Sequence, residues 1–214
     1  MSSALPPLRE RIPLVLAVLA EHYPETGTAL HFGTQFQLLI ATILSAQCTD
    51  VQVNKITPAL FAKFPTPEAM AAATVDEIVP YVKSTGFFRN KAKNIRAAAV
   101  AILERFGGEV PRTLDELVTL PGAGRKTANV VLGDGFGIPG ITVDTHVGRL
   151  SRRLGFTRHT DPVKAELALN RRIPQPEWTR FSHRLILHGR AICQARRPKC
   201  ETCPLVHLCP KVGV

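Results

Sequence analysis

Residues 120–132 read LPGAGRKTANVVL, a Pro-Gly-x-Gly turn followed directly by an apolar segment with helical spacing. A turn of this kind at the start of a helix exposes backbone amides that suit a phosphate. Lys126 lies directly behind the turn, where a lysine can clamp a phosphate, carry a surface charge or act as a nucleophile. The fold and the function of the chain depend on which of these roles applies.

The motif has part of the pattern of a nucleotide-binding phosphate loop but does not meet its requirements. Such a loop needs Gly-x4-Gly-Lys-[Ser/Thr] after a strand, whereas Arg125 occupies the position of the last glycine and the preceding residues have helical spacing. The remaining interpretation is two helices joined by a glycine hairpin. Amides at Gly122 and Gly124 can then approach a DNA phosphate, because no side chain intervenes.

Composition and charge indicate a globular protein with a polyanionic partner. The chain has 214 residues, 45% of them hydrophobic, which is enough for one large domain or two small ones. Lys and Arg number 27 against 17 Asp and Glu, a formal net charge of +10. Nine of the basic residues and only two acidic ones lie in residues 171–214, so we expect this end to contact a polyanion such as DNA.

Helical spacing of apolar residues extends over most of the chain, and capping residues are frequent. Helix starts are predicted at Thr34, Thr66, Thr113, near Arg125, near Asp144 and at Asp161, and a last long helix at about 177–195. Gly107 and Gly108 predict the end of the helix at 89–106. Because no alternating run lies between hairpin turns, the sequence predicts an all-α protein of about ten helices.

The apolar stretch IPLVLAVLA at 12–20 is the one candidate for a targeting segment. Glu10 and Pro13 interrupt it, no small-x-small cleavage site follows, and nine residues cannot span a bilayer. Its apolar residues instead have the spacing of an amphipathic helix. We expect a cytoplasmic protein that does not enter a membrane.

Four of the five cysteines, Cys193, Cys200, Cys203 and Cys209, have the spacing Cys-x6-Cys-x2-Cys-x5-Cys. The odd total and this clustering favour a reducing compartment and a metal site over disulfides. Four thiolates can enclose a zinc ion or a [4Fe-4S] cluster, and one Cys-x2-Cys pair flanked by single cysteines favours iron-sulfur while leaving zinc open. We expect Arg196 and Lys199 in this loop to contact DNA phosphates. Cys48 is predicted to be a small buried apolar residue.

Eighteen residues after Lys126, VDTHVGRL at 143–150 places Asp144 before a predicted helix. Taken alone, Asp144 fits an N-cap as well as a catalytic carboxylate, and His146 is more simply a packing or capping histidine. The set of motifs is more specific. LPGAGRKTA, VDTH and the cysteine spacing, in this order, resemble the helix-hairpin-helix DNA glycosylases, and closely their endonuclease III branch. The resemblance covers nearly the whole chain, including LLIATILSAQCTDVQVNK at 38–55 and LILHGRAIC at 185–193.

The resemblance implies a two-lobed all-α helix-hairpin-helix DNA glycosylase fold. Residues 28–138 would form a six-helix barrel domain, with the helix-hairpin-helix at about 114–133. Residues 1–27 and 139–214 would form an iron-sulfur cluster domain, with a [4Fe-4S] cluster in the loop 193–209. The expected partner is damaged double-stranded DNA, bound by a monomer associated with the nucleoid.

The resemblance also implies residue roles. Lys126 would be the nucleophile and Asp144 its essential partner. Gln47 would enter the gap left by an extruded nucleotide, and Phe87 in STGFFRNKA would wedge the duplex, although Phe87 and Phe88 could both be core aromatics. Phe87 is also bulkier than the aliphatic residue expected there. The other expected DNA contacts are Gly122, Gly124, Arg125, Thr127, His146, Arg149, Arg196 and Lys199.

These roles predict a bifunctional DNA glycosylase and AP lyase of base excision repair that removes oxidised pyrimidines from duplex DNA. A stacked base must be flipped out before its sugar can be attacked. An amine that attacks C1′ forms a Schiff base, which permits strand cleavage by β-elimination. The alternatives are a relative with a shifted substrate, such as abasic-site or mismatch incision, and a DNA-binding module without activity. A pure binder has no use for both Lys126 and Asp144.

Overall fold

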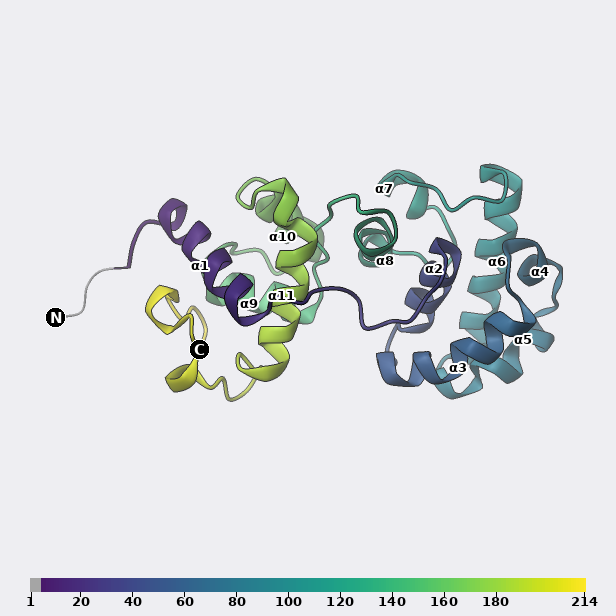
Figure 1. Cartoon of the computed structure of the whole chain (residues 1–214), viewed down its shortest axis with the longest axis horizontal. Coiled ribbons are helices and arrows are strands. Elements are labelled where there is room, and N and C mark those ends of the chain that lie inside the picture. The colour runs from purple at the N-terminus through teal and green to yellow at the C-terminus, as the bar shows by residue number, and fades with distance from the viewer. Residues whose placement is uncertain (1–4) are drawn as a thin grey trace. The chain divides into compact units, whose positions relative to one another are not determined.

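The computed structural model describes residues 5–214 of the chain (Figure 1). By its internal contacts the chain divides into two compact units, Thr28–Ile138 and Met1–Gly27 with Pro139–Val214. Residues 1–4, part of the expected iron-sulfur cluster domain, lie outside the described residues. Residues 5–214 form eleven α-helices, short 3-10 and π turns and no strand, which confirms the all-α class.

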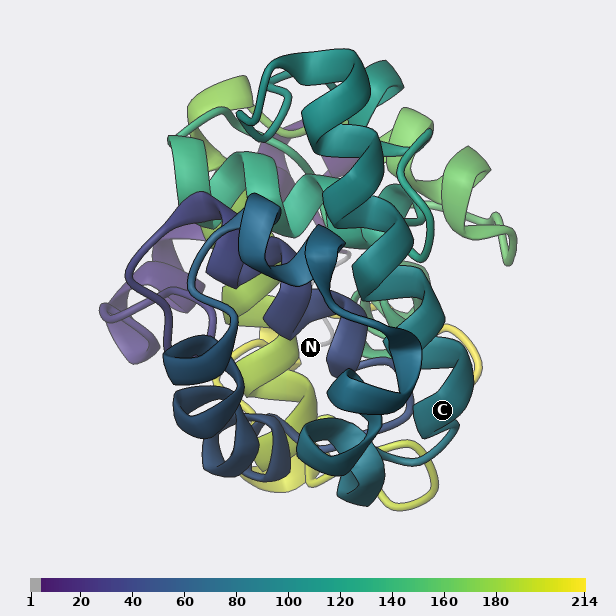
Figure 2. The same cartoon turned by 90° about the vertical axis from the view of Figure 1, so that its right-hand side faces the viewer.

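The unit Thr28–Ile138 is built around one apolar helix. Its elements are α2 (Gln35–Leu44), α3 (Asp50–Lys63), α4 (Pro67–Ala72), α5 (Val75–Val82), η1 (Lys83–Thr85), α6 (Phe88–Phe106), α7 (Leu114–Leu117), α8 (Arg125–Val130) and η2 (Val131–Gly135). Leu38, Leu39 and Ile40 are all fully buried, so neighbouring elements cover α2 on every side. The long teal helix in Figure 2 is α6, against which α4 and α5 pack.

Threonine N-caps start most helices of this unit. The side chains of Thr34, Thr66 and Thr113 each accept a hydrogen bond from a backbone N–H in the first turn of α2, α4 and α7, as predicted. Gly107, with a φ of 61°, ends α6 at the predicted position. The helix after Thr113 ends at Leu117, and the chain then turns into the glycine hairpin.

The second unit joins the N-terminal helix to the C-terminal part of the chain. Its elements are α1 (Leu8–His22), α9 (Thr145–Arg153), α10 (Pro162–Asn170), η3 (Gln175–Glu177), α11 (Trp178–Ala191), η4 (Cys200–Thr202) and η5 (Val206–Leu208). The rings of Phe156 and Phe181 are stacked in its core with centroids 6.1 Å apart. In residues 5–214, no helix has the length and apolar character needed to cross a membrane.

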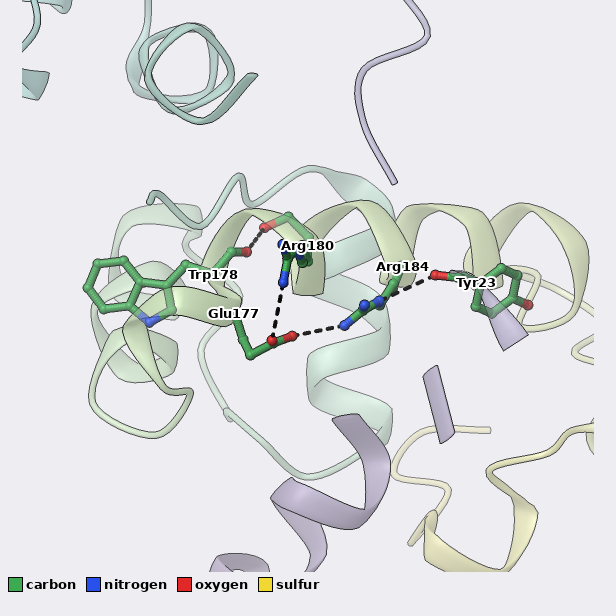
Figure 3. Close-up of polar contacts among 6 residues, drawn as sticks. Tyr23, Glu177, Trp178, Arg180 and Arg184 are labelled. Carbon is green, nitrogen blue, oxygen red and sulfur yellow. Dashed lines mark hydrogen bonds and ion pairs between the residues drawn. The ribbon is translucent and has the colours of Figure 1, made fainter. Parts of the chain in front are cut away.

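A buried arginine connects α1 to α11 (Figure 3). Nη1 of Arg184 lies 2.8 Å from a carboxylate oxygen of Glu177, and its Nε donates to the carbonyl oxygen of Tyr23 at 3.4 Å. Ile12, Val15 and Leu19 of α1 are also buried in the same apolar core as Phe156 and Phe181. The N-terminal helix is therefore an integral part of this unit.

Candidate active site and cluster loop

The turn ahead of α8 requires a glycine at position 122. The amide of Ala123 donates to the carbonyl of Leu120 at 3.0 Å, and Gly122 has a φ of 80°, as in a type II turn with proline before the glycine. A Cβ at Gly122 would lie 2.9 Å from Cβ of Asn94 in α6 and 3.0 Å from Cγ2 of Ile43 in α2. The turn therefore packs directly on α2 and α6.

Lys126 is exposed at the second position of α8. Gly124 is the N-cap of this helix and is also exposed, and a Cβ there would meet nothing within 4 Å. Ala128 and Asn129 are buried and hold α8 in the unit. The structure thus combines an anchored helix with an open space at Gly124 and an accessible amine.

Gln47 and Phe87 are both exposed and both have a left-handed backbone, with φ of 53° and 46°. Residues other than glycine adopt this conformation at a cost of about 1–3 kcal/mol, which the surrounding structure must offset. Phe87 is 68% exposed, whereas Phe88 packs against the hydrophobic core. The alternative that both are core aromatics is therefore wrong for Phe87. Cys48 is half-buried against the same core, close to its predicted role.

Asp144 is the N-cap of α9, and its Oδ1 accepts a hydrogen bond from the amide of Val147 at 2.8 Å. The capping interpretation is therefore confirmed. It does not exclude chemistry, because a carboxylate has a second oxygen with its own acceptor capacity. Asp144 and Lys126 belong to different units of the chain.

His146 packs against α11 at Gly189. A Cβ at Gly189 would lie 2.6 Å from Nδ1 of His146 and 3.1 Å from its Cβ, so α9 and α11 approach closely only because this residue is glycine. Burial lowers the pKa of His146, and the nearby Asp144 carboxylate partly opposes the shift. The packing role favoured by the sequence is observed, and a DNA contact by His146 stays a prediction.

The four clustered cysteines line one cavity in the second unit, together with Leu150, Ile192 and Leu205. All four are half-buried free thiols. Burial raises the pKa of the Cys203 and Cys209 thiols, and the neighbouring cysteines raise it further. Buried thiols of this kind become thiolates when a metal centre supplies compensating positive charge.

Among the described residues, no three His, Cys, Asp or Glu side chains are close enough together to hold a single metal ion. The thiols surround the cavity, as suits a cluster whose irons are each held by one cysteine.

Hydrogen-bonding groups surround the sulfur atoms. Arg153 Nη1 lies 3.3 Å from Cys193 Sγ, the amide of Lys211 lies 3.4 Å from Cys209 Sγ, and His188 Nε2 lies 3.4 Å from Cys203 Sγ. The hydroxyl of Tyr23 contacts His188 Nδ1 at 3.0 Å, and burial lowers the pKa of His188 to about 4. Hydrogen-bond partners of this kind orient the cysteine ligands and influence the redox potential of the metal centre that the cysteines hold.

Two arginines of α9 hold the start of the cluster loop, residues 193–209. Arg149 donates to the carbonyls of Cys193 at 2.9 Å and Gly189 at 3.3 Å. Arg153, which is buried, donates to the carbonyls of Gln194 at 2.7 Å and Ala195 at 2.8 Å. The helix α11 ends at Ala191, before the predicted residue 195, and the loop that these arginines hold follows it. Arg149 was predicted only as a DNA contact, and Arg153 was not predicted. Their i, i+4 spacing places both on one face of α9, and this was the sequence signal that could have indicated a shared role.

The remaining predicted site residues lie as follows. Arg196 and Lys199 are exposed in the cluster loop, and Arg125 and Thr127 are half-buried on α8. The buried Lys91 of α6 was also missed, because nothing in the local sequence distinguishes it from an exposed lysine.

Comparisons with known proteins identify the class and then the family. Residues 40–175 match the model of the HhH-GPD superfamily of base excision DNA repair proteins, and residues 193–209 match the iron-sulfur binding domain of endonuclease III. The class is therefore that of helix-hairpin-helix DNA repair proteins with an iron-sulfur loop.

Endonuclease III of Synechocystis sp. is 55% identical over 203 residues, covering 94% of this chain and 93% of its own length. A non-covalent endonuclease III–DNA complex superposes with a TM-score of 0.89 at 46% identity, over 95% of both chains. A trapped endonuclease III–DNA covalent intermediate matches with the same score and identity over 95% of this chain and 96% of its own. The chain belongs to the endonuclease III family.

Family membership confirms the helix-hairpin-helix glycosylase fold and the resemblance on which it was predicted. It also decides between the two metal centres left open by the cysteine spacing, in favour of the [4Fe-4S] cluster. The cavity lined by Cys193, Cys200, Cys203 and Cys209 is the site that fits it.

Alanine substitutions at the two glycines of the turn should have different effects on stability. Gly122→Ala should lower the free energy of unfolding by about 1–3 kcal/mol, because alanine is strained at this φ and its methyl group would be too close to Asn94. Gly124→Ala should lower it by no more than about 1 kcal/mol, since its methyl group meets nothing and the only cost is that alanine is a poorer N-cap than glycine. Thermal unfolding of the purified variants measures both, and equal melting temperatures would contradict the packing argument.

Replacing Arg153 should weaken retention of the cluster. Arg153→Ala removes the hydrogen bond to Cys193 and two anchors of the cluster loop, so loss of the visible iron–thiolate absorbance under a chelator should be about 10-fold faster. The half-buried neighbour Arg152 provides the matched control. Arg152→Ala should lose absorbance at the wild-type rate, and equal rates for both variants would show that Arg153 does not support the cluster.

Proposed function

We propose that the protein is a bifunctional DNA glycosylase and AP lyase of base excision repair that removes oxidised pyrimidines from duplex DNA. The observation that carries this proposal is the exposed Lys126 in the first turn of the hairpin helix α8, in a chain of the endonuclease III family. A relative has been trapped as a covalent intermediate with DNA, and such an adduct requires a protein nucleophile. Lys126 is our candidate for that nucleophile.

Binding to DNA would use both units. The amides of Gly122 and Gly124 would hold a phosphate, and Arg125, Thr127, His146 and Arg149 would make further contacts with the DNA. Gly124 supports this assignment, because the space beside it is open. Arg196 and Lys199 would neutralise further phosphates from the cluster loop. When bound, the [4Fe-4S] cluster ties the four cysteines together and so fixes this loop for the contact.

Extrusion of the damaged nucleotide would depend on Gln47 and Phe87. Flipping a nucleotide costs a few kcal/mol, and least where damage has already weakened the pairing. Exposed side chains that occupy the vacated stack offset this cost. Phe87 has the exposed aromatic surface that stacking requires.

The chemistry then follows from an amine and a carboxylate. Neutral Lys126 attacks C1′, the bond from C1′ to the base breaks, and the base leaves with the bonding electrons and takes a proton. The attacking nitrogen loses one proton, the C1′–O4′ bond of the sugar ring breaks as O4′ takes up a proton, and a protonated Schiff base joins Lys126 to C1′. This Schiff base makes the C2′ proton acidic, and loss of that proton expels the 3′ phosphate and cleaves the strand. Water hydrolyses the Schiff base and releases Lys126. Asp144 would stabilise the positive charge that develops at C1′.

We infer that the two compact units are the two domains that the resemblance implies. Thr28–Ile138 would be the six-helix barrel domain, and the unit that contains the cysteines would be the iron-sulfur cluster domain. We infer that the protein acts as a monomer on the nucleoid, in the cytoplasm.

Borohydride trapping tests the nucleophile. Wild-type protein should form a covalent adduct with an oligonucleotide that contains thymine glycol or an abasic site, and Lys126→Ala should form none, since no other amine takes its place. Lys93, exposed on α6 in the same unit, provides the control, and Lys93→Ala should form as much adduct as wild type. An adduct undiminished in Lys126→Ala would remove the nucleophile assignment.

Asp144→Asn separates the cap from the chemistry. The amide oxygen of asparagine can still accept the hydrogen bond from Val147, and asparagine is a good N-cap, so the free energy of unfolding should change by no more than about 0.5 kcal/mol. The excision rate under single-turnover conditions should nevertheless fall by about 100-fold or more, because the charge is lost. Excision at the wild-type rate would reduce Asp144 to a structural cap.

A further inference from the structure

Lys91 is a buried cation that the proposed chemistry does not use. It lies in the first turn of α6 and is only 5% exposed. Its Nζ donates to the carbonyl of Leu44 at 2.8 Å and to the carbonyl of Thr85 at 2.6 Å. Lysine is almost never buried to this extent unless it is paired, and here two backbone carbonyls take the place of water.

The two carbonyls lie at the ends of two different helical elements. Leu44 is the last residue of α2, where carbonyls lack partners within the helix and a positive charge is favoured by the helix dipole. Thr85 is the last residue of η1, and its hydroxyl is also engaged, donating to the carbonyl of Val82 at 2.8 Å. One ammonium group therefore joins two segments that lie about forty residues apart in the sequence.

Each segment leads directly into one of the exposed, strained residues. Gln47 follows Leu44 by three residues and Phe87 follows Thr85 by two, and both have a left-handed backbone. Strained conformations of this kind persist only where the surrounding structure holds them. Lys91 provides such a restraint at the base of both turns. Burial lowers the pKa of Lys91, which disfavours the charged form. The hydrogen bonds to the two carbonyls favour the ammonium, and in return the ammonium restrains both turns.

We propose that Lys91 is a positioning residue for nucleotide extrusion, which holds the turns of Gln47 and Phe87 at a fixed separation so that both side chains engage the same step of the duplex. The inference rests on the proposed function. Lys91 touches no reacting atom and acts only through these two residues. A displacement of about 1 Å in a positioned group can cost 100-fold in rate, so loss of the ammonium should be visible in the kinetics.

The test compares Lys91→Met, which keeps an unbranched apolar stem and removes the charge, with Lys93→Met on the exposed face of α6. Excision of thymine glycol from a duplex is measured under single-turnover conditions. Fluorescence of a 2-aminopurine beside the lesion reports unstacking on binding. Lys91→Met should excise about 10-fold to 100-fold more slowly and give a weaker fluorescence rise. Borohydride trapping on a single-stranded abasic oligonucleotide, which needs no extrusion from a pair, should be unchanged, and Lys93→Met should equal wild type throughout.

A double-mutant cycle distinguishes positioning from general destabilisation. If Lys91 acts through the two turns, adding Lys91→Met to a Gln47→Ala, Phe87→Ala protein should slow excision little further. A full additional loss, an equal fall in trapping on single-stranded DNA, or a wild-type rate for Lys91→Met would each overturn the proposal. If Lys91→Met does not fold, Lys91→Gln, which can still donate to one carbonyl, takes its place. If wild type forms no adduct with any substrate, the proposed function fails, and the 2-aminopurine signal still tests Lys91.

Discussion

Two close approaches of backbone, one in each unit, determine where the candidate catalytic side chains lie. A methyl group at Gly122 would lie 2.9 Å from its nearest neighbour in α6, and one at Gly189 would lie 2.6 Å from the ring of His146. In the first unit this contact seats the turn from which α8 and Lys126 begin. In the second it allows α9, with Asp144 at its start, to pack on α11. Packing interiors are too dense to absorb an extra atom without a shift, so both positions depend on the absence of a side chain.

The basic residues of the second unit divide between two tasks. Arg149 and Arg153 direct their donors to carbonyls of the cluster loop, while Arg196 and Lys199 are exposed on that loop. A short loop with two prolines has little apolar surface to bury, so hydrogen bonds from arginine and the bonds to the cluster replace a core. The charge that would attract DNA is thus presented by a segment that other arginines hold in place.

The candidate site also departs from local rules of chain conformation where the proposed function needs it to. Gln47 and Phe87 are non-glycine residues in the left-handed region, and Lys91 is a buried lysine. Each departure alone costs free energy of folding, but the ammonium of Lys91 donates hydrogen bonds to the carbonyls beside both turns, so each group provides the partner that the other needs. Asp144 needs no such departure, since one oxygen of its carboxylate caps a helix and the second has its own acceptor capacity. Departures of this kind are concentrated at functional sites in natural proteins.

The sequence by itself determined the helical class, the capped helix starts at Thr34 and Thr66, the end of α6 at Gly107 and the four cysteine ligands, because all of these signals are local. Only the tertiary structure decided the rest. Pro58 and Pro80 lie inside α3 and α5, where local propensity predicts a break, and packing of those helices outweighs the lost hydrogen bonds. The partners of Lys91 could not be predicted from the local sequence either, because one of them is 47 residues away. The burial of Lys91 likewise depends on the residues that surround it in the folded protein.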